Sequence, residues 1–214
     1  MRKTALFSVI VAIALLSGCC SLLNNNEIVE NQSSNVTQNV TVNEAYAAGN
    51  GIRCLMLFSS ENASKLGMAN APDRINGTVL IKEGKTRWSL DVLSSGKTIK
   101  ENSVVEGDTL ITEVTDQKID SLKLNGTQYA KAIGPLKQCK WLQVDKTMLP
   151  GEIGSFYSAI NLISGNMTIP QIQKAYSDKG ISMQCDYEPI SNAAFVTGDY
   201  CTYQDILIKV LTGG

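Results

Sequence analysis

The chain has 214 residues with 19 basic and 20 acidic side chains, and it contains no histidine. The lack of histidine excludes Ser-His-Asp and Cys-His catalysis and metal sites with histidine ligands. The nearly balanced charge, without a basic block, argues against binding to nucleic acid and against an electrostatic grip on a membrane.

The N-terminal residues predict export from the cytoplasm. Arg2 and Lys3 stand in front of a twelve-residue apolar run at positions 5–16. A helix that crosses a membrane needs about 20 consecutive apolar residues. A shorter run behind a positively charged start is typical of a signal peptide, so we assign residues 1–18 to one.

The next residues, Leu16-Ser17-Gly18-Cys19, resemble the lipobox of prokaryotic lipoproteins. This resemblance implies cleavage after Gly18, a diacylglycerol on the sulfur of Cys19, and residence on the outer face of the cell membrane. In this interpretation Cys20 is either a second acylation site or a free thiol. The alternative is an ordinary signal peptide that ends at a cysteine.

A polar segment follows the lipobox, and we expect residues 19–43 to form a flexible tether. It is rich in Asn, Ser and Thr and has no helical or strand period, so it cannot bury enough apolar surface to offset its ordering entropy. Asn-x-Ser/Thr sequons are more frequent than composition gives by chance, which indicates a glycosylated surface protein of an archaeon or bacterium; the alternative is plain asparagine richness. The sequons lie at Asn31, Asn35, Asn39, Asn62, Asn76, Asn125 and Asn166.

The remaining residues, 44–214, have a length typical of one domain. The four cysteines of this domain form no C-x-x-C pair. Because an even number of cysteines in an exported chain is typical of disulfides, we predict two of them. We expect Cys185 to pair with Cys201, because the intervening residues look like a strand, a turn and a returning strand. The second bridge then joins Cys54 to Cys139.

The middle of the domain has turn signals about every ten residues, which is typical of short antiparallel strands. The signals are Gly84, Gly96, Gly107-Asp108, Asp116-Gln117 and Asn125-Gly126, and the predicted strands are 78–82, 86–92, 103–105, 109–114 and 119–124. Trp88, Leu90 and Val92 alternate with polar neighbours. One face of the sheet is therefore apolar and must be covered.

Helices are the predicted cover for this apolar face. Residues 151–164 place apolar side chains at helical spacing, and a second helix begins after Thr168 as its N-cap and ends at Gly180. A strand at 181–187 and a terminal helix at 205–211 complete the domain. We therefore predict an α+β fold, in which a curved antiparallel, half-barrel-like sheet is covered on one face by a few helices.

The lipobox, the polar tether and the meander segment 77–88 (Gly-Thr-Val-Leu-Ile-Lys-Glu-Gly-Lys-Thr-Arg-Trp) look like the half-barrel lipoproteins of the LolA and LppX type. The resemblance covers about residues 52–145. It implies an open, strongly curved sheet around a helical lid, with a lipid or lipoprotein carried in the apolar hollow. The candidate lining residues are Trp88, Leu90, Val92, Leu110, Phe156 and Ile160.

Short segments match parts of catalytic motifs, but the other residues that these motifs require are absent from the sequence. Gly84-Lys85-Thr86 and Gly96-Lys97-Thr98 match the end of a phosphate-binding loop, but the glycine required five residues earlier is missing and strand-like sequence follows. Ser94-Ser95-Gly96-Lys97 fits Ser-x-x-Lys without its partner motifs. We interpret these motifs as hairpin turns. Acidic residues lack calcium-loop spacing, so we expect no metal. We also expect no cofactor and no enzymatic activity.

Two function classes remain. One is a binding module that holds a lipid or other hydrophobic ligand in an apolar hollow. The other is a structural or interaction protein of the cell envelope, with a filled core and a surface that contacts another protein. The size of the inward side chains separates the two classes, because large residues such as Trp88 fill a hollow.

Overall fold

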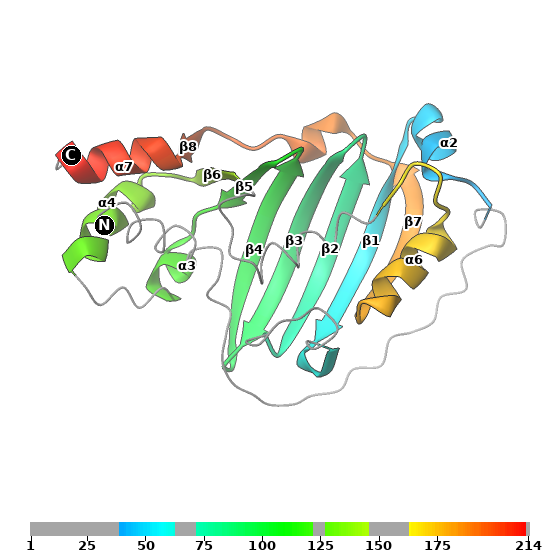
Figure 1. The fold of residues 1–214 in the computed structure, drawn as a ribbon, viewed down its shortest axis with the longest axis horizontal. Helices are drawn as coiled ribbons and strands as arrows, with labels where there is room; N and C mark the ends of the chain where they lie inside the picture. Colours follow the sequence, from blue (N-terminus) through cyan, green and yellow to red (C-terminus); the bar gives the residue numbers. More distant parts are fainter. Residues whose placement is uncertain (1–38, 63–71, 122–126, 146–162, 213–214) are drawn as a thin grey trace.

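A computed structural model describes residues 39–62, 72–121, 127–145 and 163–212 of the chain. These residues form an α+β unit around one eight-stranded, mostly antiparallel sheet (Figure 1). Among the described helices, none is both long and apolar enough to cross a membrane. The predicted features outside the described residues are the signal peptide, Cys19, Cys20, Asn31, Asn35, Asn125, Phe156 and Ile160.

The elements follow one another along the chain as labelled in Figure 1. They are α2 (Val42–Ala47), β1 (Asn50–Ser59), β2 (Arg74–Lys82), β3 (Lys85–Ser94), β4 (Lys97–Glu106), β5 (Thr109–Glu113), α3 (Asp116–Ser121), α4 (Thr127–Lys137), β6 (Trp141–Asp145), α6 (Ile169–Asp178), β7 (Ile181–Pro189), the 3-10 helix η3 (Asn192–Phe195), β8 (Tyr200–Thr202) and α7 (Tyr203–Thr212).

The strand order in the sheet is β7-β1-β2-β3-β4-β5-β6-β8. Strands β1 to β5 are neighbours in sequence and in space, whereas β7 returns to pair antiparallel with β1. Strand β8 pairs parallel with β6 at the opposite edge. The last third of the chain therefore visits both edges of the sheet.

The predicted hairpin turns at Gly84, Gly96 and Gly107 are confirmed. Glu83 and Gly84 both have positive φ (48° and 79°), as do Ser95 and Gly96 (51° and 70°). Two consecutive residues of this kind make the type I′ turn, whose twist matches that of the flanking strands. The motifs that resemble a phosphate-binding loop and Ser-x-x-Lys therefore lie in hairpin turns.

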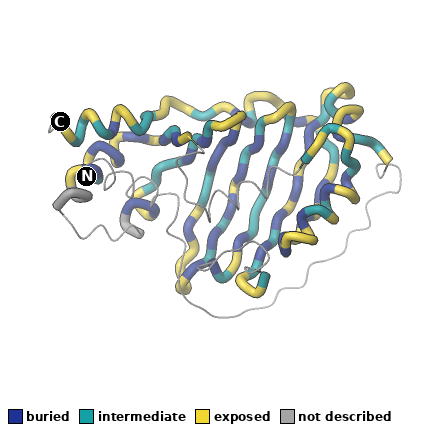
Figure 2. Tube along the Cα trace, viewed as in Figure 1, coloured by how far each residue is buried: buried dark blue, intermediate teal, exposed yellow. Residues whose placement is uncertain are grey.

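The predicted alternation along β3 is also confirmed. Trp88 is 1% exposed, and Leu90 and Val92 are buried beside it, while Ser89 points to solvent. We call the face that carries Trp88 the inner face and the opposite one the outer face. Figure 2 shows buried positions alternating with more exposed ones along the central strands. Leu110 of β5 is also fully buried and belongs to the same core.

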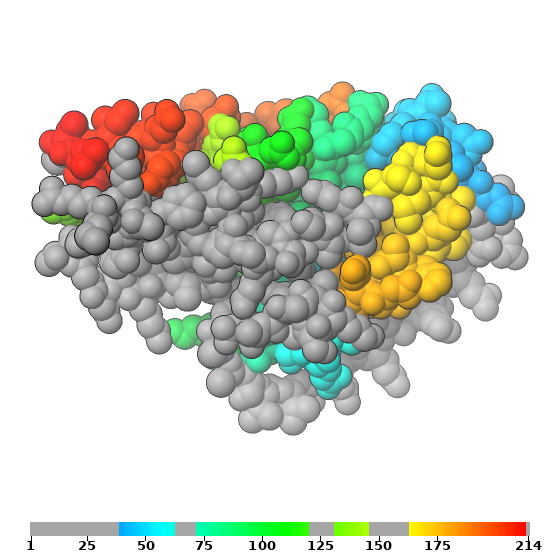
Figure 3. All heavy atoms as spheres, in the orientation of Figure 1, coloured from blue at the N-terminus to red at the C-terminus, as the bar shows by residue number. Residues whose placement is uncertain are grey.

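Helix α6 confirms the predicted helix behind Thr168. The side chain of Gln171 accepts a hydrogen bond of 2.8 Å from the Thr168 N–H, and Gly180 with φ of 80° follows the helix. Ile172 and Tyr176 are buried where α6 packs on β7. Figure 3 shows α6 and α7 at opposite ends of one face of the molecule. The predicted terminal helix is confirmed as α7, which begins two residues earlier than expected.

Other predicted boundaries need correction. Residues 119–121 belong to helix α3 and not to a strand, because Lys118 and Ile119 turn together into the interior. The turn expected at Asp116-Gln117 is the start of this helix. Of the predicted helix at 151–164, only residues 163 and 164 are described, and they are not helical. The predicted tether is too long, because Val42 is 1% exposed inside α2.

Both cysteine pairs differ from the predicted ones. Cys54 bonds to Cys185, its direct cross-strand partner between β1 and β7, and Cys139 bonds to Cys201. The predicted Cys185–Cys201 bridge is wrong because the chain after β7 does not return as a hairpin. It crosses to the far edge of the sheet, where β8 carries Cys201. The expectation of two disulfides is confirmed.

We predict that peptide mapping without reduction recovers Cys54 linked to Cys185 and Cys139 linked to Cys201. The bridges span 131 and 62 residues, so loop-closure entropy gives each about 4–5 kcal/mol of stability in the chain-entropy model. Replacing Cys54 and Cys185 together by Ala should lower the free energy of unfolding by an amount of that order. A peptide linking Cys185 to Cys201 would contradict the described topology.

Candidate functional site

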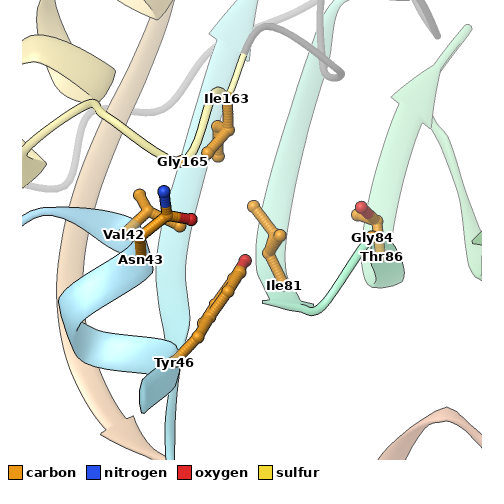
Figure 4. A pocket seen from close by; sticks show the side chains of 8 residues that line it. All are labelled: Val42, Asn43, Tyr46, Ile81, Gly84, Thr86, Ile163 and Gly165. Atoms are coloured by element: carbon orange, nitrogen blue, oxygen red, sulfur yellow. The ribbon is translucent and has the colours of Figure 1, made fainter. Parts of the chain in front are cut away.

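A pocket of about 220 Å³ opens at the rim of the inner face, and we call it the rim pocket. It lies between helix α2, the segment before α6 and the β2–β3 hairpin (Figure 4). Its lining residues are Val42, Asn43, Tyr46, Ile81, Gly84, Thr86, Ile163 and Gly165. Three segments far apart in the sequence therefore build one concave site.

Helix α2 forms one wall because its N-terminus is fixed from two sides. Thr41 and Glu44 form a capping box, in which the Glu44 carboxylate accepts a 2.8 Å hydrogen bond from the Thr41 N–H. The N–H groups of Val42 and Asn43 donate to the carbonyls of Met167 and Gly165, each at 2.9 Å. The first turn of α2 is thereby tied to the segment that precedes α6.

Gly165 keeps this junction tight. A Cβ atom at this position would lie 2.2 Å from Oδ1 of Asn43, so any larger residue must displace that side chain. The carboxamide of Asn43 also donates to Oδ1 of Asn166 at 3.5 Å. The small size of Gly165 thus lets the Asn43 amide remain in the pocket lining.

The lining combines aliphatic and uncharged polar groups. Val42, Ile81 and Ile163 supply the apolar walls, and Ile81 is 6% exposed. The polar groups are the Asn43 amide and the hydroxyls of Tyr46 and Thr86. Figure 4 shows Tyr46 extending from α2 across the opening toward Ile81. The described residues of the lining are all uncharged, which favours a neutral occupant.

Two tyrosines near the pocket stay neutral over a wide pH range. Desolvation by burial raises the pKa of Tyr46, and a hydrogen bond from the Glu83 backbone partly opposes that rise. The pKa of Tyr187 is raised to about 12, first by desolvation and then by Tyr46 and Glu44. The Tyr187 hydroxyl donates to the carbonyl of Val40 at 2.9 Å. Both side chains therefore act as uncharged hydrogen-bonding groups.

The dimensions and chemistry of the pocket limit what it can hold. At ~30 Å³ each, about seven water molecules fill it, and whole drug-sized ligands need ~300 Å³ or more. A hydrocarbon occupant gains about 0.8 kcal/mol per buried methylene. The same occupant loses about 1–3 kcal/mol of binding free energy for each polar group of the pocket that gives up its hydrogen bond to water. These contributions nearly cancel, so an occupant with hydroxyl groups and an apolar face fits better.

The residues predicted to line a hollow do not line this pocket. Trp88, Leu90, Val92 and Leu110 are buried in the core. The predicted tether includes Val42 and Asn43, so the sequence does not predict the rim pocket. One signal in the sequence could have located its wall: Thr41-x-x-Glu44 is the pattern of a capping box, and it marks the start of a helix.

The sequon asparagines in the described residues differ in exposure. Asn39 and Asn166 are exposed, and Asn62 and Asn76 are half-buried. Asn76 lies within strand β2, where a glycan would project from the sheet. Asn166 lies beside the rim pocket through its contact with Asn43.

A buried polar cluster lies away from the pocket. The ammonium of Lys118 is 2.7 Å from Oε2 of Glu101 and donates to the Thr112 hydroxyl at 3.2 Å. The Ser103 hydroxyl also donates to Glu101. Because Ser103 is fully buried, no substrate reaches it from solvent. The cluster instead attaches α3 to strands β4 and β5.

The outer face of the sheet carries a second, smaller hollow. A hollow of about 80 Å³ on the outer face, between β1 and β7, is lined by Arg53, Leu55, Gln184, Asp186 and Glu188. It has room for two or three waters at ~30 Å³ each. In the part of the chain that the structure describes, no three His, Cys, Asp or Glu residues come together as metal ligands would.

No known protein family, no curated protein and no solved structure matches the chain. The two disulfides indicate an oxidising, extracytoplasmic compartment.

The raised pKa of Tyr187 predicts a loss of stability at alkaline pH. Between about pH 10 and pH 12 the unfolded chain releases this proton while the folded chain keeps it, so the stabilisation is complete below pH 10 and declines above it. Melting temperatures across this range should fall less for Tyr187→Phe than for the wild type. An identical decline for both proteins would contradict the assignment to Tyr187.

Proposed function

We propose that the protein is a non-enzymatic binding module on the outer face of the cell membrane, anchored by an acyl group on Cys19. In this proposal the signal peptide, residues 1–18, is removed, and the polar segment that follows links the folded unit to the bilayer. The two disulfides support an extracytoplasmic location. The exposed sequon residues Asn39 and Asn166 are the proposed glycan sites that a folded surface leaves most accessible.

The rim pocket is the observation that carries the binding proposal. It is concave, it is lined by both aliphatic and hydrogen-bonding groups, and it opens beside the exposed residue Asn43. The inner face next to it is filled by large side chains, of which Trp88 is the largest. This combination favours a module that holds a small group of an envelope component over a carrier that encloses a whole lipid.

Carriage of a lipid or other hydrophobic ligand is the second candidate, within a half-barrel fold of the LolA and LppX type. The open sheet with helices α2 and α6 packed on its strands supports this kinship. Val42, Ile81 and Ile163 form an apolar wall that could contact the end of an acyl chain. In this candidate the rim pocket is the mouth of the hollow.

Contact with an envelope protein is supported by the C-terminal part of the chain. Of the described large apolar side chains that are exposed, Val196, Tyr200, Ile208 and Leu211 come from the last described segment and Leu55 from β1. Helix α7 carries two of them on one side while Ile206 is buried on the other. A helix that is apolar on several sides is typical of one with more than one packing partner.

The substitution Trp88→Ala separates a packed core from a ligand hollow. If the inner face is packed, the free energy of unfolding falls by ~3–5 kcal/mol, and neither form binds an apolar fluorescent dye. Leu55→Ala, at an exposed position on the outer face, is the control and should change stability by about 0.5 kcal/mol or less. Thermal melts and dye titrations measure both effects.

The opposite set of results would show that the protein carries a ligand in a hollow and that its inner face is not packed. It consists of a small loss of stability for Trp88→Ala, dye binding that changes with the substitution, and stoichiometric lipid in native mass spectra of the gently purified wild type.

The anchor proposal predicts that Cys19→Ser abolishes acylation. The variant should no longer incorporate a labelled fatty acid, and it should be released from the membrane fraction or keep its signal peptide. Cys20→Ser is the matched control, because it leaves the lipobox cysteine in place. Unchanged labelling of Cys19→Ser would refute the lipobox assignment.

A further inference from the structure

We propose that the rim pocket binds one neutral sugar ring at the accessible end of an envelope glycan. The inference rests on the proposed function, since it names the ligand class of the same pocket. It follows from three properties of the described lining residues: the types of their hydrogen-bonding groups, the lack of charge among these residues, and the small volume that they enclose.

The polar groups of the lining match hydroxyl groups in both directions of hydrogen bonding. The Asn43 carboxamide has two N–H donors and an acceptor oxygen, and the hydroxyls of Tyr46 and Thr86 each donate and accept. Neighbouring hydroxyls on a sugar ring also donate and accept, so they can pair with all three groups. A hydrocarbon chain would satisfy none of them.

The charges of the described residues at the pocket disfavour an acidic ligand. None of the described lining residues is a cation, so these residues offer no counter-charge to a carboxylate or phosphate. The negative charge of Glu83 acts on Tyr46 and raises the pKa of that tyrosine, although the hydrogen bond from the Glu83 backbone lowers the same pKa by more. The same negative charge repels an anionic sugar and leaves a neutral one unaffected.

The shape of the pocket suits a single ring. Its volume of about 220 Å³ corresponds to about seven waters at ~30 Å³ each, which accommodates a pyranose and little more. The aromatic ring of Tyr46 and the aliphatic walls of Val42 and Ile81 offer apolar surface to the C–H face of the sugar. Asn43 is exposed at the edge, so the rest of a glycan can extend into solvent.

The test uses the full-length protein in a detergent without a sugar headgroup. The probes are the methyl glycosides of glucose, mannose, galactose and N-acetylglucosamine, with glucuronate, inorganic phosphate and hexanol for comparison. Saturation-transfer NMR detects binding, and titration gives the dissociation constant, which we expect at ~1–10 mM for one neutral glycoside. Glucuronate, phosphate and hexanol should show no saturable binding.

Matched variants assign that binding to the rim pocket. Tyr46→Phe keeps the ring and removes the hydroxyl, so the dissociation constant should rise about tenfold. Gly165→Ala should weaken binding as well, because its Cβ displaces the Asn43 side chain. Tyr200→Phe changes an exposed tyrosine outside the pocket lining and should leave the constant unchanged. Thermal melts confirm that each variant is folded.

The inference would be overturned if the folded wild type showed no saturation transfer to any neutral glycoside, or if Tyr46→Phe and Tyr200→Phe bound the glycoside equally. Saturable binding of hexanol in place of the glycosides would also refute the sugar assignment, yet it would leave the binding module standing. Stoichiometric co-purified lipid is the separate result that removes the proposed function itself.

Discussion

The pairing of β7 with β1 is the constraint on which the rest of the molecule depends. It aligns Cys54 with Cys185 as direct cross-strand partners, and their disulfide joins positions 131 residues apart. Closing so long a loop is entropically costly. Because the disulfide keeps the loop closed in the unfolded chain as well, most of this entropy is not lost on folding. Because β7 is fixed beside β1, helix α6, which precedes β7 directly, is held against the same edge of the sheet.

The rim pocket is a consequence of this pairing. The segment before α6 reaches the start of α2, where Val42 and Asn43 hydrogen-bond to backbone carbonyls of that segment. The Tyr187 hydroxyl of β7 binds the backbone at Val40 from the other side. Helix α2 has only six residues and would be marginal on its own. Its position, and hence the position of Tyr46, is set by contacts with residues more than one hundred positions away.

The opposite edge of the sheet is secured by a second set of constraints. Cys201 on β8 is bonded to Cys139, just before β6, and helix α7 packs on α4. The ion pair between buried Lys118 and half-buried Glu101 attaches α3 to the sheet. Removing Glu101 leaves an uncompensated buried charge on Lys118, which typically costs ~3–5 kcal/mol. The two edges are thus fixed independently, and the apolar residues that extend beyond this edge on α7 remain exposed.

By itself, the sequence determined the features that depend on local chemistry. Glycine turns, period-two alternation around Trp88 and the cap at Thr168 act over a few residues, and all three are confirmed. The even cysteine count predicted two disulfides correctly, but not their partners. Partner choice depends on which edge each strand joins, and β7 and β8 join opposite edges.

Only the tertiary structure decided the features that depend on distant contacts. The strand predicted at 119–124 is helical in its described part because Lys118 finds its charge partner on β4. The rim pocket is assembled from segments around Tyr46, Ile81 and Gly165, none of which is distinctive alone. From its sequence context, a polar residue such as Asn43 is predicted to belong to a linker. Its position in the fold depends on the distant carbonyl that accepts its N–H, and the long-range pairing of strands brings that carbonyl close.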